Sequence, residues 1–193
     1  MSSAGQRLIA GMGCILMAGS TPIVLGTPVQ TGAQRYVNRL FGFSVQIPAG
    51  RPTCRAEPYT QDTGIMIFLD RGPSDCRDRN KRASVSVNGN YNAMEAHSLF
   101  ELLAIYCGTA QPQRTSSEEF GNLREVWPAM CRVQRENGFV DLILVRQSPV
   151  STVGETPRID YDAVIHASSG ELSKHVKSAK EILRSVRFLP PTE

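Results

Sequence analysis

The sequence has few of the features that mark nucleic-acid-binding proteins, metalloenzymes and hydrolases. Its 21 lysines and arginines are nearly balanced by 18 aspartates and glutamates, which gives a net charge of +3 in 193 residues. This small excess excludes a dominant role in binding nucleic acid or anionic membranes. It has only three histidines, and it contains no Gly-rich phosphate loop, His-Glu-x-x-His or Gly-x-Ser-x-Gly motif. We therefore predict a protein that is not an enzyme and that binds no metal and no cofactor.

Residues 1–33 are predicted to form a secretory signal peptide. They contain one charged side chain, Arg7, which is followed by an apolar stretch over 8–18, the order found in export signals. Small residues ending at Ala33 favour cleavage after that position, and Ala18-Gly19-Ser20 is a second candidate site. An uncleaved membrane anchor is an alternative, although glycines and a proline interrupt the run. Lipid attachment at Cys14 is disfavoured because the residues before it lack the usual leucine. The expected location is the bacterial periplasm, without stable membrane insertion after signal removal.

Residues 34–193 are predicted to form a single α+β domain. A chain of this length hides roughly 70% of its unfolded surface on folding, enough for a core that needs no metal. Hydrophobic residues make up 41% of the sequence and charged residues 20%, a balance typical of globular proteins. No internal repeat or linker divides this part of the chain.

Four cysteines remain after signal removal, and their even number predicts two disulfides in an oxidising compartment. Three pairings are open to Cys54, Cys76, Cys107 and Cys131. Zinc is the alternative, but no two of these cysteines are closer than 22 positions, whereas structural zinc sites generally use ligands two to four positions apart. A catalytic thiol is not indicated either, because the sequence places no histidine beside a particular cysteine.

Hydrophobic patterning predicts several strands and two helices. Strands are expected at 43–47, 64–69, 83–87 and 161–167, with 70–82 as a loop. Asn92 and Glu95 form a candidate capping pair for the first helix, which Gly108 would end. Its apolar stripe is Leu99, Leu102, Leu103 and Tyr106. Ser168 and Glu171 fit a capping box for the second helix, whose apolar stripe is Leu172, Val176, Ala179, Leu183 and Val186. The basic residues on its other side could form a docking face, but a solvated helix surface is the simpler interpretation.

Asn137-Gly138 predicts a β-hairpin, because this dipeptide tolerates the positive φ angles of a two-residue type I′ turn. Such a turn would pair Glu136 with Phe139, Val133 with Leu142, and Cys131 with Leu144. Cys131 would then point into the core, where a helix ending at Cys107 could meet it. We therefore predict the disulfides Cys107–Cys131 and, by elimination, Cys54–Cys76.

Two segments of the sequence resemble a known family. The segment 36–50, Tyr-Val-Asn-Arg-Leu-Phe-Gly-Phe-Ser-Val-Gln-Ile-Pro-Ala-Gly, and the segment 179–188, Ala-Lys-Glu-Ile-Leu-Arg-Ser-Val-Arg-Phe, are similar to the opening and the close of PsbP/Mog1-like exported bacterial proteins, among them DcrB-type proteins. The resemblance implies an α/β sandwich, an antiparallel β-sheet packed with helices. It also implies binding rather than catalysis, since members include photosystem accessory subunits, a nuclear-transport cofactor, phage-adsorption lipoproteins and type VI secretion chaperones. The four cysteines are not part of the pattern, and no functional residue is carried over.

The leading hypothesis is a periplasmic, non-catalytic binding or accessory protein that recognises a protein partner in the cell envelope, as an immunity-type or complex-assembly factor. One candidate surface is the segment 70–82, with five basic and three acidic residues, because arginine can bind a carboxylate through two hydrogen bonds. Its candidate partner-binding residues are Arg71, Arg77, Arg79 and Arg82. The other candidate is the polar connection 147–160, which is longer than usual. The alternative for segment 70–82 is a solvated loop without a binding role. The alternative for 147–160 is a disordered segment.

Two further functions stay open. A small apolar ligand could bind between the sheet and the helices, near Phe43, Phe100, Trp127 and Phe139, although aromatic residues are more often core. An unrecognised hydrolase would need clustered carboxylates, or a histidine-paired nucleophile, in a cleft.

Overall fold

The structure is a computed structural model that describes residues 32–56, 63–72, 75–91, 96–108, 110–111, 113–116, 120–148 and 158–189. The strands are β1 Gln34–Asn38, β2 Phe43–Ile47, β3 Thr53–Ala56, β4 Gly64–Phe68, β5 Ser84–Tyr91, β6 Gln113–Arg114, β7 Ala129–Gln134, β8 Phe139–Gln147, β9 Ile159–Ser168 and β10 Arg187–Phe188. The helices are η1 Cys76–Lys81, α1 Leu99–Cys107, α3 Leu123–Val126 and α4 Leu172–Arg184. The predicted signal up to residue 31, the capping pair Asn92 and Glu95, and positions 149–157 of the polar connection lie outside the described residues.

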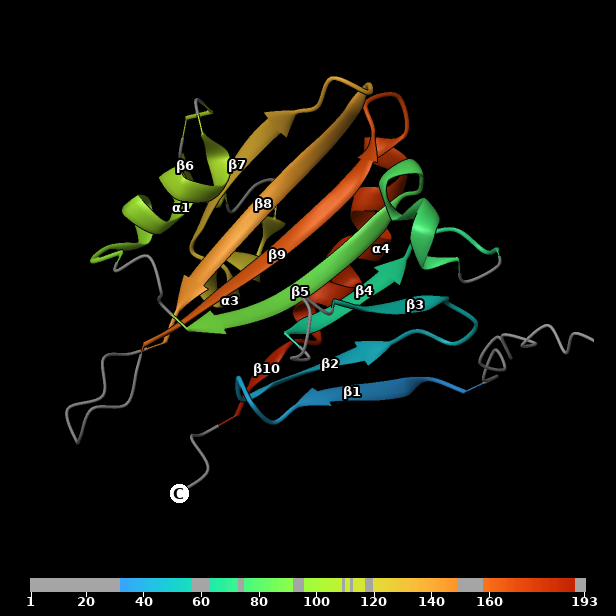
Figure 1. Ribbon diagram of the computed structural model, residues 1–193, viewed down its shortest axis with the longest axis horizontal. Helices are drawn as coiled ribbons and strands as arrows, with labels where there is room; N and C mark the ends of the chain where they lie inside the picture. The colour runs from blue at the N-terminus through green and yellow to red at the C-terminus, as the bar shows by residue number, and fades with distance from the viewer. Residues whose placement is uncertain are drawn as a thin grey trace, which may run out of the picture.

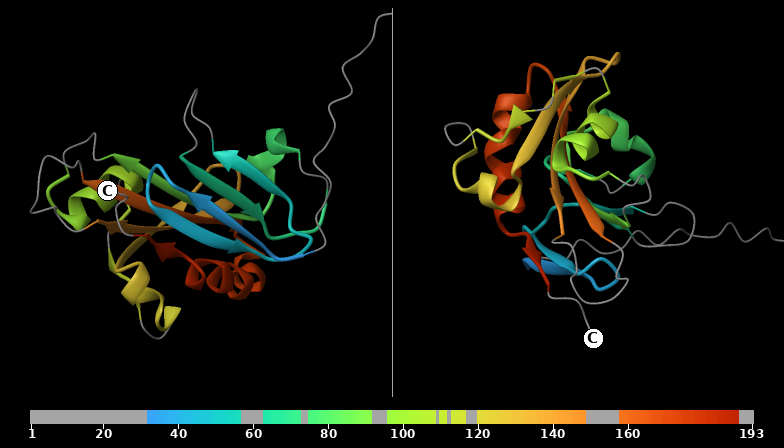
Figure 2. Two further views of the ribbon diagram at one scale, coloured as in Figure 1. Left: turned by 90° about the horizontal axis from the view of Figure 1, so that it is seen from below. Right: turned by 90° about the vertical axis from the view of Figure 1, so that its left-hand side faces the viewer.

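The strands form two antiparallel sheets (Figure 1). The larger has the order β3-β4-β5-β9-β8-β7-β6, and the smaller has the order β1-β2-β10. Helix α4 packs against one face of the large sheet, whereas α1 and η1 lie on the opposite side (Figure 2). The architecture is therefore α+β, as the sequence predicts.

The main core lies between the large sheet and α4. Alternate residues of the strands point toward α4, because side chains in a strand alternate between the two faces. These buried strand residues include Ile65, Ile67, Val85, Val87, Val140, Leu142, Leu144, Ala163 and Ile165. Helix α4 contributes Leu172, Ala179, Ile182 and Leu183 to the same core, which confirms the predicted apolar stripe. A smaller core on the opposite face joins α1 to β7 and β8 through Leu102, Leu103, Cys107, Ala129, Cys131, Ile143 and Val145.

The predicted strands are confirmed as β2, β4, β5 and β9, the last two longer than expected. The expected loop 70–82 contains the short helix η1, which begins after Asp75, whose side chain accepts a hydrogen bond from the backbone N–H of Arg77. Three edge strands, β1, β3 and β6, carry no clear alternation and were not predicted. Apolar patterning thus identifies strands that bury a face and misses short strands at the edge of a sheet.

The helix starts differ from those predicted. Helix α1 begins after Ser98, whose hydroxyl accepts a hydrogen bond from the backbone N–H of Glu101, and the Glu101 carboxylate accepts one from the N–H of His97. Ser98 and Glu101 have the spacing of a capping box, but the carboxylate accepts from His97, the residue before the N-cap, and not from Ser98 itself. Gly108, with a φ of 57°, ends the helix as predicted. Helix α4 has no side-chain cap. The predicted Ser168 capping box is wrong, because the Ser168 hydroxyl donates to the Glu171 carboxylate and caps no backbone N–H.

The hairpin exists, but the predicted register is wrong. Its loop has three residues, 136–138, because the N–H of Arg135 donates to the Phe139 carbonyl, and Gly138 adopts a φ of 78°. A three-residue loop with a left-handed glycine is a common alternative to the two-residue turn. Cys131 therefore faces Ile143 and Val133 faces Asp141, while Leu142 and Leu144 point toward α4.

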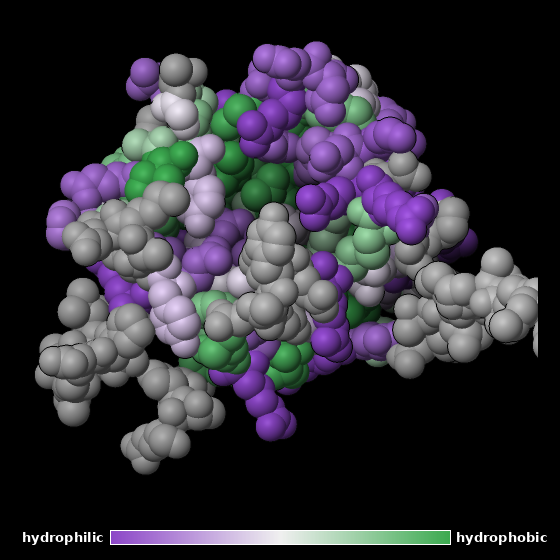
Figure 3. Space-filling model, viewed as in Figure 1, coloured by the Kyte–Doolittle hydropathy of each residue, from purple (hydrophilic) through white to green (hydrophobic). Residues whose placement is uncertain are grey.

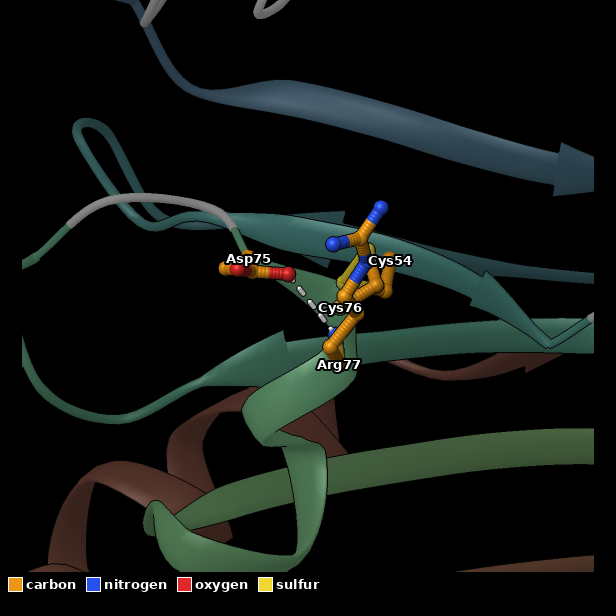
Figure 4. Close-up of a disulfide and its surroundings, with 4 residues drawn as sticks. All are labelled: Cys54, Asp75, Cys76 and Arg77. Atoms are coloured by element: carbon orange, nitrogen blue, oxygen red, sulfur yellow. Dashed lines mark hydrogen bonds between the residues drawn. A yellow bond between two sulfur atoms is a disulfide. The ribbon is translucent and has the colours of Figure 1, made fainter.

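Both predicted disulfides are present. Cys107–Cys131 links the end of α1 to β7, and Cys54–Cys76 links β3 to the start of η1 (Figure 4). The Cys107–Cys131 prediction succeeds in spite of the wrong register, because Cys131 still points inward, on the face that α1 covers. In the described part of the chain, no helix is long and apolar enough to cross a membrane.

Candidate functional site

The large sheet has a partly uncovered surface on the side opposite α4. Helix α1 packs over β7 and β8 at one end of this side, and η1 lies at the other end, where it is bonded to β3. Between them lie half-buried side chains of β4, β5 and β9. We call this surface the open face and define it by Met66, Ser86, Asn88, Asn90, Val164 and His166. Figure 3 looks onto this side and shows apolar side chains near α1 and mostly hydrophilic ones near η1.

The strand register arranges polar side chains in rows across the open face and beneath it. One row contains Ser84, His166 and Asp141 from β5, β9 and β8. Two rows further along the strands, Asn88 lies opposite Asp162, and the next row contains Asn90, Asp160 and Gln147. Polar residues at these alternating positions are unusual in central strands of a sheet that is covered on both sides. They indicate a surface that is hydrated or that binds another molecule.

Asp162 is a buried carboxylate beneath this surface, with 5% of its surface exposed. The side-chain amides of Asn88 and Asn90 donate hydrogen bonds to its two oxygens, at 2.8 and 3.4 Å, and the hydroxyl of Tyr106 in α1 also donates to it. Burial raises the pKa of Asp162 to about 6, although the hydrogen bonds from Asn88 and Tyr106 act in the opposite direction. Burial and the charge of Asp162 in turn raise the pKa of Tyr106. Through these hydrogen bonds, Asp162 links β5 and β9 beneath the open face to α1.

Asp160 lies one row closer to the start of β9 and is also buried. The amide of Gln147 donates a hydrogen bond to it at 3.0 Å. Burial raises the pKa of Asp160 above its ordinary value, even though this hydrogen bond and the charge of Arg158 lower it. Two buried carboxylates thus lie under one end of the open face, whereas the exposed arginines lie at the η1 end.

We predict that Asp162 makes the stability of the protein depend on pH. Its pKa is about 6 in the folded protein against an ordinary 3.8, so the folded state binds the proton more tightly than the unfolded state. The free energy of unfolding must therefore fall as the pH rises between these two values, by up to roughly 3 kcal/mol. In Asp162→Asn this fall is absent, so the stability of the variant relative to the wild type should increase from pH 4 to pH 7.

Urea denaturation across this pH range measures the effect. The matched control is Glu136→Gln, which removes an exposed carboxylate in the hairpin loop and should leave the pH profile unchanged. A constant difference between Asp162→Asn and wild type at every pH would contradict the prediction.

A second polar group lies at the η1 end of the open face. His166 Nδ1 donates to Asp141 Oδ1 at 2.6 Å, and Arg135 Nε donates to Asp141 Oδ2 at 2.6 Å. Burial alone would raise the pKa of Asp141, but these hydrogen bonds hold it below its ordinary value. The other ring nitrogen of His166 lies 3.4 Å from the carbonyl oxygen of Asn80 in η1, and Phe139 stacks on the ring. His166 thus links β8, β9 and η1.

This histidine bears on the hydrolase hypothesis. Ser84 lies beside His166 in the register, and serine, histidine and aspartate in a row suggest a catalytic triad. However, Ser84 is only 1% exposed, and His166 Nε2 faces a carbonyl oxygen. Both ring nitrogens are directed at acceptors, so the row fits a structural link better than an activated nucleophile.

The structure places the four predicted partner-binding arginines in different settings. Arg82 binds Asp70 through two nitrogens, at 2.8 and 3.1 Å, and its guanidinium lies 4.1 Å from the centre of the Phe68 ring. Arg71, Arg77 and Arg79 are exposed. Arg82 therefore holds the segment in place, and the other three remain available for a partner.

The four aromatic residues considered for an apolar ligand do not converge on one site. Phe43 and Trp127 are fully buried in the core on the α4 side, Phe100 is exposed on α1, and Phe139 stacks on His166. Among the described residues, no group of three or more histidine, cysteine or acidic side chains could hold a metal ion.

The polar rows were missed at the level of sequence, although a signal for them exists. Asn88 and Asn90 are two positions apart in β5, and Asp160 and Asp162 are two positions apart at the start of β9. Each pair therefore lies on one face of its strand. Such polar alternation in an otherwise apolar strand indicates a face that is not packed against an apolar layer.

No protein-family model matches this chain, and no curated protein sequence matches it. Among solved structures, it is similar to the solution structure of cyanobacterial PsbP (CyanoP) from Synechocystis sp. PCC 6803. The two sequences are 13% identical, and the match covers 82% of this chain and 93% of the other, with a TM-score of 0.37. A likeness at this level carries no argument about function, and membership of the PsbP/Mog1-like family stays a prediction.

Proposed function

We propose that this protein is a non-catalytic accessory protein of the bacterial periplasm that recognises a protein partner through the open face and η1. The observation that carries the proposal is the placement of the two disulfides. Each one fixes a helix to the sheet on the same side, Cys107–Cys131 for α1 and Cys54–Cys76 for η1, and the open face lies between these helices.

This arrangement favours binding for an energetic reason. Ordering of side chains and loops at an interface costs free energy when two proteins associate, and a surface that is already fixed avoids part of that cost. The polar rows of β5, β8 and β9 supply hydrogen-bonding groups, and α1 adds the exposed apolar residue Ile105. Polar groups near exposed apolar side chains are the usual composition of a protein–protein interface.

The periplasmic location is supported by the same disulfides, which persist in oxidising compartments, and by the predicted signal peptide. The absence of catalysis is supported by the setting of His166, whose two ring nitrogens are directed at oxygen acceptors.

Site-specific photo-crosslinking in the native host tests the proposal. A photoreactive amino acid replaces Ser86 on the open face or, as the matched control, the exposed Ser173 on α4. The expected result is a crosslink to one envelope protein from position 86 and none from position 173. Equal crosslinking from both positions, or crosslinking from position 173 alone, would show that the open face is not the recognition surface.

A further inference from the structure

The segment that carries η1 exposes three arginines to solvent. Within the described residues, the guanidinium groups of Arg71, Arg77 and Arg79 make no hydrogen bond and no ion pair, and all three residues are exposed. The segment 70–82 has five basic and three acidic residues. Asp70 binds Arg82, and Asp75 accepts the backbone N–H of Arg77. The segment therefore presents an excess of positive charge to solvent.

The same segment is held in place at three points. Cys76 is bonded to Cys54 of β3, the carbonyl of Asn80 faces His166 of β9, and Arg82 binds Asp70 while it covers the ring of Phe68. Figure 4 shows Arg77 directly beside the disulfide, with its guanidinium extending away from η1. Arginines on a fixed backbone lose less conformational entropy on binding than arginines on a free loop.

The rest of this side of the sheet limits the kind of anion that fits. Asp160 and Asp162 lie under the other end of the open face, so a long polyanion that followed the sheet would meet negative charge there. The net charge of the chain, only +3, also opposes nucleic acid, whose binding depends on many neutralised phosphates. A short acidic segment of a protein can place its carboxylates at η1 without reaching Asp160 and Asp162, so it avoids this repulsion.

We infer that the partner presents an aspartate- or glutamate-rich segment to η1, where Arg77 and Arg79 bind its carboxylates. This inference rests on the proposed function, because it assigns the chemistry of the partner that meets the open face. Arginine is suited to this role, since its planar guanidinium binds a carboxylate through two parallel hydrogen bonds.

The test uses the full chain, expressed with its own amino-terminal segment and purified with both disulfides intact. The probe is a short fluorescent peptide of alternating glutamate and serine, and fluorescence anisotropy at low salt measures its affinity. Arg77→Glu combined with Arg79→Glu should weaken binding roughly tenfold or more. The control combines Arg124→Glu with Lys177→Glu, two exposed positions on the α4 side, which changes the net charge by the same amount and should have little effect.

The outcomes separate the inference from the proposed function. An equal loss in both double variants, or equal binding of a peptide with glutamine in place of glutamate, would show that no specific acidic site exists at η1. A crosslink from position 86 without any binding of the acidic peptide would overturn the inference and leave the proposed function intact. The milder pair Arg77→Gln with Arg79→Gln should give a smaller loss of affinity at an unchanged melting temperature, which excludes misfolding as the cause.

Discussion

A variant with Cys107→Ala and Cys131→Ala is expected to lose about 3.5 kcal/mol of the free energy of unfolding. The two cysteines are 24 positions apart, and removing their bond restores the entropy of that loop to the unfolded chain. Both side chains are buried in the smaller core between α1 and the sheet, so the variant also loses packing there. Urea denaturation without reductant measures the change.

The matched comparison is Cys54→Ala with Cys76→Ala. Its loop is of similar length, 22 positions, so the entropic loss should be nearly equal. Cys76 is exposed, however, so the loss of packing should be smaller. The Cys107/Cys131 variant should therefore be less stable than the Cys54/Cys76 variant, by the packing energy lost in the smaller core. Only the Cys54/Cys76 variant should weaken binding of the acidic peptide at η1. Wild-type stability in either variant would contradict the assigned role of that disulfide.

Replacing Trp127 by alanine is expected to cost about 3 to 5 kcal/mol, the range for removing a large aromatic side chain from a core. Trp127 has no exposed surface and packs edge-on against Phe188 of β10. Its indole N–H is buried and has no hydrogen-bond partner in the described structure. A buried donor without a partner destabilises the folded state, so phenylalanine at this position should recover part of the loss.

Trp127→Phe is accordingly predicted to cost only about 1 kcal/mol, because it removes the unpaired N–H and keeps an aromatic ring. Since this is the only tryptophan, circular dichroism rather than fluorescence must follow unfolding. If phenylalanine proved as destabilising as alanine, the indole N–H would have a partner, or the ring shape at this position would matter more than its polarity.

The predictable part of this fold is the part that depends on local pattern. The alternation Phe43, Val45, Ile47 identified β2, and the apolar stripe of α4 was read correctly because both elements bury one face. The hairpin was found from Asn137-Gly138, but its register was not. Two-residue and three-residue loops both accept this dipeptide, and sequence does not distinguish them.

The open face was beyond prediction from sequence because it depends on where the helices rest. The predicted Cys107–Cys131 bond places the end of α1 against β7, but nothing in the sequence of α1 indicates that the helix leaves β5 and β9 partly exposed. The polar alternation of Asp160 and Asp162 is visible in the sequence, but the burial that raises the pKa of Asp162 arises only when β5 and α1 pack around it. The sequence indicates four candidate arginines, Arg71, Arg77, Arg79 and Arg82. The pairing of Arg82 with Asp70, which sets it apart from the others, is evident only in the structure.

The small sheet has a consequence for how this chain folds. Strand β2 pairs with β1, its neighbour in sequence, and with β10, and the backbone N–H of Gln46 donates to Ser185 Oγ across 139 positions. Contacts between distant parts of a chain form slowly, because closing a long loop is entropically costly. While the chain is being synthesised, β2 has only one of its two partner strands until β10 has been made. The small sheet therefore cannot be completed until β10 is made, and this delay fits the proposed periplasmic location, because export acts on chains that have not yet folded.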